Sequence, residues 1–154
     1  MSSTVTINGL AELKKLAGSE LGTGEWIEIT QERINTFADA TGDHQWIHTD
    51  PERAADGPFG APIAHGYLTL SLFIPLFSAL LDVRGVTTKV NYGLDKVRFP
   101  APVPVGSRIR LAARLASVDE VPGDGVQIAV DGTIEIENGP KPAAVLRSLS
   151  RFYA

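Results

Sequence analysis

Apolar residues recur every three or four positions in two early segments, and this spacing predicts two short helices. The first helix is expected over residues 10–17. The second is expected over 30–40, with Thr30 as its cap and Gly42 as its end. Between them, residues 25–29 alternate apolar and polar side chains, as a strand does.

The middle of the chain combines a polar loop with an uncharged segment that follows it. Residues 43–60 are expected to form a loop with one helical turn after Pro51. The 16 residues from Gly66 to Leu81 then carry no charged side chain, although Pro75 lies among them. A helix that is apolar nearly all round must be enclosed by the rest of the protein. A membrane span needs about 20 residues, so we expect a buried core helix and no membrane association.

The second half of the chain is rich in Val, Ile and Thr, and Pro, Gly and Asp punctuate it. Five strands are expected there, over residues 86–92, 97–99, 107–121, 125–137 and 143–153. Residues 122–125 (PGDG) predict a hairpin turn. Early helices followed by long strands favour an α+β protein. We expect a single domain over 1–154 in the hot-dog arrangement, a long curved antiparallel sheet wrapped around the central apolar helix.

Composition and charge narrow the classes of function. The 154 residues are 44% hydrophobic and 21% charged, which excludes disordered and fibrous proteins. The net charge of −4, with no basic cluster, argues against nucleic acid as a partner. The absence of cysteine excludes disulfides, thiolate metal sites and cysteine nucleophiles. The first residues do not resemble a secretory signal, so a cytoplasmic location is expected.

The polar segment 41–50 concentrates two histidines and two aspartates, and three interpretations compete for it. His44 and His48 are four residues apart and could bind a metal, but only on a helix, and the segment has no helical period. Alternatively, Asp43 caps a turn and His48 is hydrogen-bonded in a wall of the protein. The third interpretation is acid–base chemistry, for which a carboxylate beside an imidazole is the minimal set.

A second candidate feature is Gly66, where the apolar helix begins. A helix N-terminus presents free N–H groups and the positive end of the helix dipole. Such a donor can stabilise the oxygen of a developing enolate. The alternative is that Gly66 only lets the chain turn into a crowded helix.

Three blocks of sequence resemble the MaoC-like dehydratases and (R)-specific enoyl-CoA hydratases. Residues 37–48 (FADATGDHQWIH) resemble the hydratase-2 motif of that family. Residues 62–71 (PIAHGYLTLS) and 98–106 (RFPAPVPVG) resemble its second and third blocks, in the same order. The chain departs from the family at Gln45 and Trp46, where most members have Asn-Pro. In this departure it resembles the nodulation-N-like branch of the family. Asp43 and His48 keep the family's spacing of five.

The resemblance implies a reaction and a set of roles. Asp43 and His48 would hold a water molecule and exchange protons with it. Gly66 would offer its N–H to the thioester oxygen, and Ser71 would supply a supporting hydroxyl. The reaction implied is reversible syn hydration of a trans-2-enoyl thioester of coenzyme A or acyl carrier protein, in a homodimer. No metal or organic cofactor is implied.

Two other functions remain open on the same fold. A hot-dog thioesterase would share the thioester pocket but attack the carbonyl group. A non-catalytic acyl-thioester-binding dimer module would keep the motif without turnover.

Overall fold

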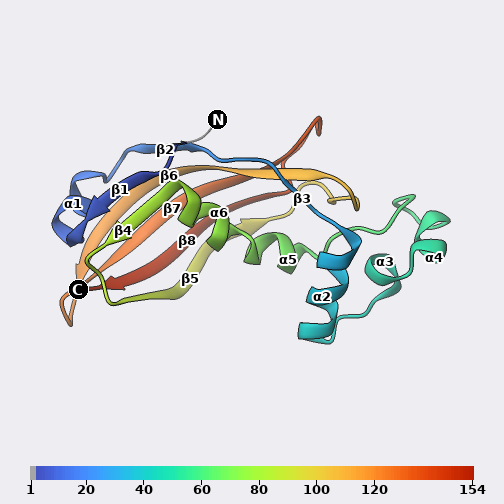
Figure 1. The fold of residues 1–154 in the computed structure, drawn as a ribbon, viewed down its shortest axis with the longest axis horizontal. Helices are drawn as coiled ribbons and strands as arrows, with labels where there is room; N and C mark the ends of the chain where they lie inside the picture. The colour runs from blue at the N-terminus through green and yellow to red at the C-terminus, as the bar shows by residue number, and fades with distance from the viewer. Residues whose placement is uncertain (1–2) are drawn as a thin grey trace.

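The computed structural model describes residues 3–154, and a curved antiparallel sheet forms its body (Figure 1). The strands of this sheet are β2 (Glu20–Thr23), β3 (Ile27–Glu28), β5 (Thr88–Arg98), β6 (Arg108–Val121), β7 (Gly125–Ile136) and β8 (Ala144–Tyr153). Their order is β2-β6-β7-β8-β5, and β3 also pairs with β6. The chain therefore places β5 at one edge of the sheet.

The apolar segment lies on the concave face of this sheet as two consecutive helices, α5 (Gly66–Ser71) and α6 (Phe73–Leu80) (Figure 1). The prediction of a helix here is confirmed, but the prediction that it runs unbroken to residue 81 is wrong. Pro75 has no N–H to donate to the carbonyl of the residue four before it, so the helix is interrupted at Leu72.

The central helices and the sheet share one hydrophobic core. Alternate side chains of β6, β7 and β8 point inward, as a sheet with one buried face requires. They pack on α6 through large apolar residues that include Phe73, Leu76 and Leu80. Burying each such side chain contributes about 1.5–3 kcal/mol. Complete enclosure of the helix was expected and is wrong for the single chain, because one sheet covers one side only and Tyr67 remains 71% exposed.

Several short elements were not predicted from the sequence. A parallel pair joins β1 (Val5–Asn8) to β4 (Leu81–Arg84), outside the main sheet. The strands expected over 86–92 and 97–99 form one strand, β5, with two register shifts. Of the strand expected over 25–29, only β3 is in the sheet, and β2 was missed.

The remaining helices are α1 (Gly9–Lys15), α2 (Gln31–Thr41), α3 (Trp46–Thr49) and α4 (Pro51–Ala55). Figure 1 shows α2, α3 and α4 projecting beyond the sheet, next to the start of α5. The expected turn after Pro51 is confirmed as α4, whereas α3 lies in a segment expected to be a loop. Within residues 3–154, no helix is both long enough and apolar enough to cross a membrane.

The predicted turn chemistry is also confirmed. The Thr30 side chain accepts a hydrogen bond from the Arg33 N–H at the start of α2, and Gly42 ends that helix with φ of 82°. In the hairpin between β6 and β7, Gly123 and Asp124 have φ of 90° and 55°, in the left-handed region that Gly and Asp tolerate.

Candidate active site

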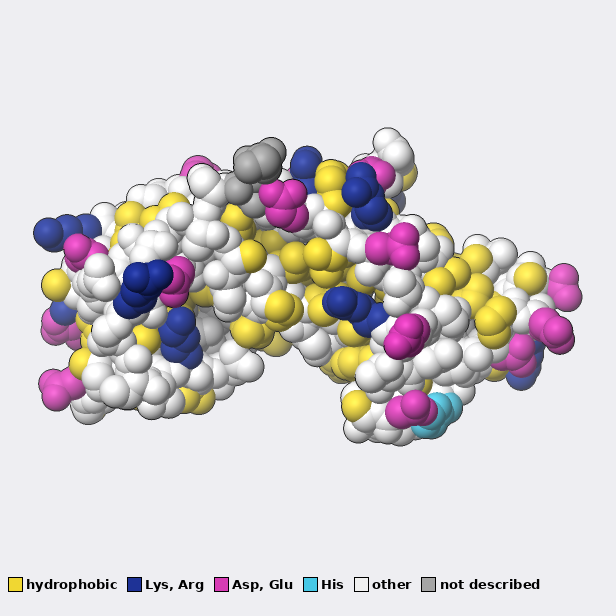
Figure 2. All heavy atoms as spheres, in the orientation of Figure 1, with side chains coloured by type: hydrophobic (Ala, Val, Ile, Leu, Met, Phe, Trp, Pro, Cys, Tyr) yellow, Lys and Arg dark blue, Asp and Glu magenta, His cyan; other side chains and the backbone are white. Residues whose placement is uncertain are grey.

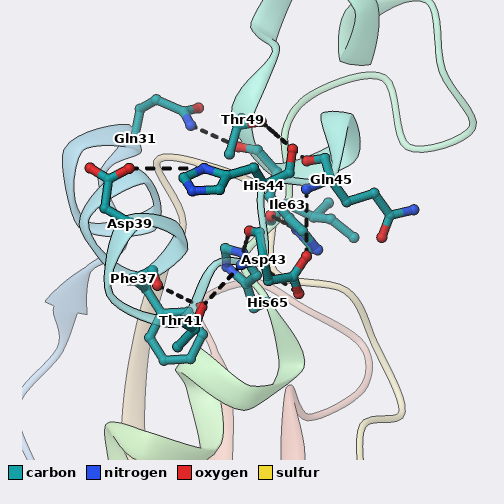
Figure 3. A network of polar contacts seen from close by, with 11 residues as sticks. Gln31, Phe37, Asp39, Thr41, Asp43, His44, Gln45, Thr49, Ile63 and His65 are labelled. Carbon is teal, nitrogen blue, oxygen red and sulfur yellow. Dashed lines mark hydrogen bonds and ion pairs between the residues drawn. The ribbon is translucent and has the colours of Figure 1, made fainter.

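Asp43 is the first residue after the turn that ends α2. Because Gly42 adopts a left-handed conformation, the chain leaves the helix axis and carries Asp43 toward the start of α5 (Figure 3). The Asp43 Oδ1 atom accepts a hydrogen bond of 3.5 Å from the Gln45 N–H, which holds the carboxylate in a local turn. The side chain is 50% exposed, so it can be both hydrated and in contact with the buried residues beneath it.

His48 lies in α3 and is buried. Its Nδ1 atom is 2.7 Å from the carbonyl oxygen of Ile63. A carbonyl can only accept, so Nδ1 carries the hydrogen, and in the neutral ring Nε2 keeps a free lone pair. Burial lowers the pKa of His48, and the nearby His65 lowers it further, against the opposing effects of the Ile63 carbonyl and Asp43. At neutral pH the ring is therefore a base whose accepting atom is Nε2.

The sequence assigned no role to His65, which the structure places against both Asp43 and His48. Its side chain is 2% exposed, and its Nε2 atom is 2.9 Å from the main-chain oxygen of Asp43 (Figure 3). Its ring stacks on that of His48 with 3.9 Å between centroids and 25° between planes. The Phe37 ring lies 4.9 Å from it, centroid to centroid.

Together, the side chains of Asp43, His48 and His65 bring one oxygen and two nitrogens within 4.8 Å of one another. One water molecule that makes two hydrogen bonds of about 2.8 Å bridges groups about 4.5 Å apart. The carboxylate and the His48 ring are thus at a separation that suits a shared water.

The same three residues are a poor metal site. Lone pairs of an imidazole lie in the ring plane, so those of two stacked rings run side by side instead of converging on one ion. One nitrogen of each ring already faces a carbonyl oxygen. The expected alternative of His44 with His48 is not assembled either, because the His44 Nδ1 lies 3.9 Å from the Asp39 carboxylate on the exposed side of the loop (Figure 3).

A cavity of about 330 Å³ opens beside His48 and the start of α5. Its polar lining consists of His48, Gly66 and Thr69, and its other walls are mainly apolar, from Ile63, Phe99, Ala101, Pro102, Val103 and Ala143. Gly66 is the first residue of α5, where N–H groups have no acceptor in the helix. A Cβ atom at Gly66 would lie 3.2 Å from the Phe99 ring, so this position also requires close approach.

The structure does not place the Ser71 hydroxyl, expected to support the site, on the wall of this cavity. Ser71 donates to the Tyr67 carbonyl at 2.7 Å and is exposed, away from the cavity wall. The hydroxyl residue on that wall is Thr69, which is buried. Sequence reasoning missed Thr69, although it lies three residues after Gly66 and therefore on the same helix face.

Known proteins resemble this chain in sequence and in fold. Residues 12–136 match the family described as MaoC like domain. The chain is 52% identical over 149 residues to 3-hydroxyacyl-thioester dehydratase Z of Mycobacterium tuberculosis, covering 97% of this chain and 99% of the relative. It is 48% identical over 136 residues to Nodulation protein N of Rhizobium meliloti, covering 87% and 84%.

The solved structure of a monoamine oxidase regulatory protein from Archaeoglobus fulgidus superposes on this one with a TM-score of 0.78. The match is at 24% identity and covers 96% of this chain and 97% of the other. The expected α+β hot-dog architecture is confirmed.

Proposed function

The chain belongs to the MaoC-like dehydratase family, and on this premise we propose that it adds water reversibly to a trans-2-enoyl thioester, giving the (R)-3-hydroxyacyl thioester. It is a dehydratase or hydratase, that is, a hydro-lyase. The observation that supports the finer assignment is the Asp43–His48 pair, with a carboxylate oxygen and a ring nitrogen within 4.8 Å of each other and with the hydrogen of His48 on Nδ1, so that Nε2 is the proposed base. A relative that is 52% identical over nearly the whole chain is named for a 3-hydroxyacyl thioester, which supports this substrate class.

The proposed step begins with a water held between Asp43 and His48. His48 Nε2 takes a proton from this water while its oxygen forms a bond to C3 of the enoyl group. The π electrons move toward the thioester carbonyl, and the Gly66 N–H stabilises the resulting enolate oxygen. The Asp43–His48 pair then returns a proton to C2 from the same face, so the addition is syn. The pair ends with the same number of protons that it had at the start.

The rate gains that are typical of a general base and of an oxyanion donor are consistent with these roles. A positioned base typically gives about 10²–10⁴-fold acceleration. One oxyanion donor is typically worth about 3–4 kcal/mol of transition-state stabilisation. The buried base and the helix-start donor need no metal or organic cofactor for this reaction. Coenzyme A or acyl carrier protein enters only as the carrier of the acyl group.

We further propose a homodimer formed through β5. Within residues 3–154, this strand pairs with β8 on one side and with no strand on the other. Val90, Tyr92 and Leu94 are exposed on it, and Figure 2 shows hydrophobic side chains gathered across the middle of one face, where Figure 1 places α5 and α6. An apolar free edge promotes pairing. A second copy added antiparallel along β5 removes the edge in both protomers.

A direct assay separates the three functions that the sequence left open. With crotonyl-CoA, a hydratase removes the absorbance of the conjugated alkene without releasing thiol. A thioesterase releases free thiol, which a disulfide reagent detects, and a binding module does neither. Chiral analysis of the product is expected to give the (R)-3-hydroxy enantiomer, and the (S) product would contradict the proposed face of addition.

A further inference from the structure

We infer that His65 is a positioning residue, which holds the Asp43 turn with one ring nitrogen and the His48 ring with its face. The inference rests on the proposed hydration and adds a third residue to the pair that performs it. His65 does not need to touch substrate for this role, and it is absent from the lining of the cavity beside His48.

The first contact fixes the position of Asp43. Because the main-chain oxygen of Asp43 can only accept, the His65 Nε2 atom at 2.9 Å must carry the hydrogen. The other ring nitrogen, Nδ1, is buried and has no hydrogen-bond partner within residues 3–154. The ring therefore serves, through Nε2, as a fixed donor to the turn that carries the carboxylate.

The second contact fixes the orientation of His48. Its ring is held at one edge by the Ile63 carbonyl and across one face by the His65 ring, which in turn packs against Phe37. These contacts leave Nε2 as the only ring nitrogen free for proton transfer. Misplacing a catalytic group by about 1 Å can cost about 10²-fold in rate. The contacts that hold the His48 ring are therefore expected to affect turnover directly.

The stacked contact also acts on the pKa of His48. The His65 ring lies 3.9 Å away, centroid to centroid, and lowers that pKa. The titratable groups that act on His48 are His65 and Asp43. The 99–103 segment and Ala143, which form the far wall of the cavity, contribute no charge. Replacing His65 by a neutral ring should therefore raise the pKa of His48 while keeping the stacked face.

Two variants separate the two contacts. His65→Phe keeps a ring against His48 and loses the donor to Asp43, whereas His65→Gln keeps a donor and loses the ring. We expect each to fold and to lower kcat for crotonyl-CoA by about 10-fold or more, with KM within about threefold of the wild type. His44→Phe is the matched control, because His44 is an exposed histidine of the same loop, and its kcat should not change.

A second readout distinguishes positioning from general packing. The acid limb of kcat/KM is expected to move to higher pH in His65→Phe, and the His48 midpoint followed by ¹⁵N NMR should move with it. Folded variants with kcat within about twofold of the wild type and an unmoved midpoint overturn the inference. A lower kcat that tracks a lower Tm, again with an unmoved midpoint, also overturns it. If the wild-type protein hydrates no enoyl thioester, the proposed function fails, and the NMR midpoint still decides whether His65 sets the state of His48.

Discussion

At the scale of single residues, the proposed chemistry depends on two side chains that serve one water molecule. Asp43→Asn and His48→Gln preserve shape and remove proton exchange, so each should lower kcat by at least about 10²-fold. The double variant should lose little more than either single one, because each change alone already disables the shared step. Steady-state kinetics with crotonyl-CoA measures this, and near wild-type kcat in either single variant contradicts the mechanism.

The buried state of His48 predicts a pH dependence of stability. Burial lowers its pKa in the folded protein from the ordinary value of 6.5, so below that value the unfolded chain binds the proton more readily. The stability contributed by neutral His48 is fully present above pH 6.5 and is lost as the pH falls through the lowered folded pKa. Thermal melts at pH 7.5 and 5.5 should show a larger fall in Tm for the wild type than for His48→Gln. Equal falls in Tm would show that another group governs the loss of stability at acidic pH.

Gly66 combines a proposed oxyanion donor with a close contact to Phe99, and substitution can separate the two. Gly66→Val should lower kcat by about 10²-fold with a small change in Tm if its side chain obstructs the thioester oxygen. If the glycine is needed only for packing against Phe99, Tm should fall instead, and turnover per folded molecule should stay normal. In that case Phe99→Leu in the same protein should restore Tm, because the contact at 3.2 Å is with the Phe99 ring.

At the scale of elements, Trp46 stands where the resemblance places proline in most family members, and it joins two short helices beside the site. Trp46 is half-buried in α3, with the Arg53 guanidinium 4.3 Å from its ring centroid and Gly57 against its other atoms. A Cβ atom at Gly57 would lie 2.8 Å from Trp46 Cζ3. The aromatic ring thus packs α3, which carries His48, against α4.

Displacing Trp46 should therefore disturb the site from outside it. Gly57→Ala is expected to lower kcat by about 10-fold through movement of α3. The matched control is Gly24→Ala, because Gly24 has room for a Cβ at 3.7 Å from Leu80 and lies away from α3. The kcat values and the His48 NMR signal of both variants provide the measurement. A Gly57→Ala protein with an unchanged His48 signal would show that Trp46 does not position α3.

Elements with a clear local period were predictable from the sequence, and those set by distant contacts were not. The long strands β6, β7 and β8 alternate over most of their length and end at turn residues, so local rules locate them within about a residue or two. The pair β1 and β4 is four residues long in each strand and exists only because residues 76 positions apart meet, as Val5 and Leu81 do. The break at Leu72 follows from Pro75, and the prediction of one unbroken helix across that proline was wrong.

The residues of the candidate site also divide into those that the sequence could predict and those that depend on distant contacts. Asp43 and His48 lie within one short motif, so their proximity was predictable from the sequence. His65 joins them from 22 positions beyond Asp43, through a contact that depends on how α2, α3 and α5 pack. Thr69 rather than Ser71 reaches the cavity because α5 turns that face toward His48. Side-chain direction on a helix is fixed only when the partner elements are known.

At the scale of the whole molecule, the single chain leaves the outer side of the α5 and α6 helices and the edge of β5 exposed, and a second copy would cover both. Light scattering of the wild type at micromolar concentration should therefore give twice the chain mass of 16.5 kDa.

Leu94→Glu places a charge on the exposed edge strand of each copy and should shift the protein toward the monomer. Val145→Glu is the control, since Val145 is also exposed and apolar but lies on β8, inside the sheet. A dimer that survives Leu94→Glu and dissociates with Val145→Glu would place the interface on the outer face of the sheet instead. A wild type that runs at 16.5 kDa would refute the homodimer outright.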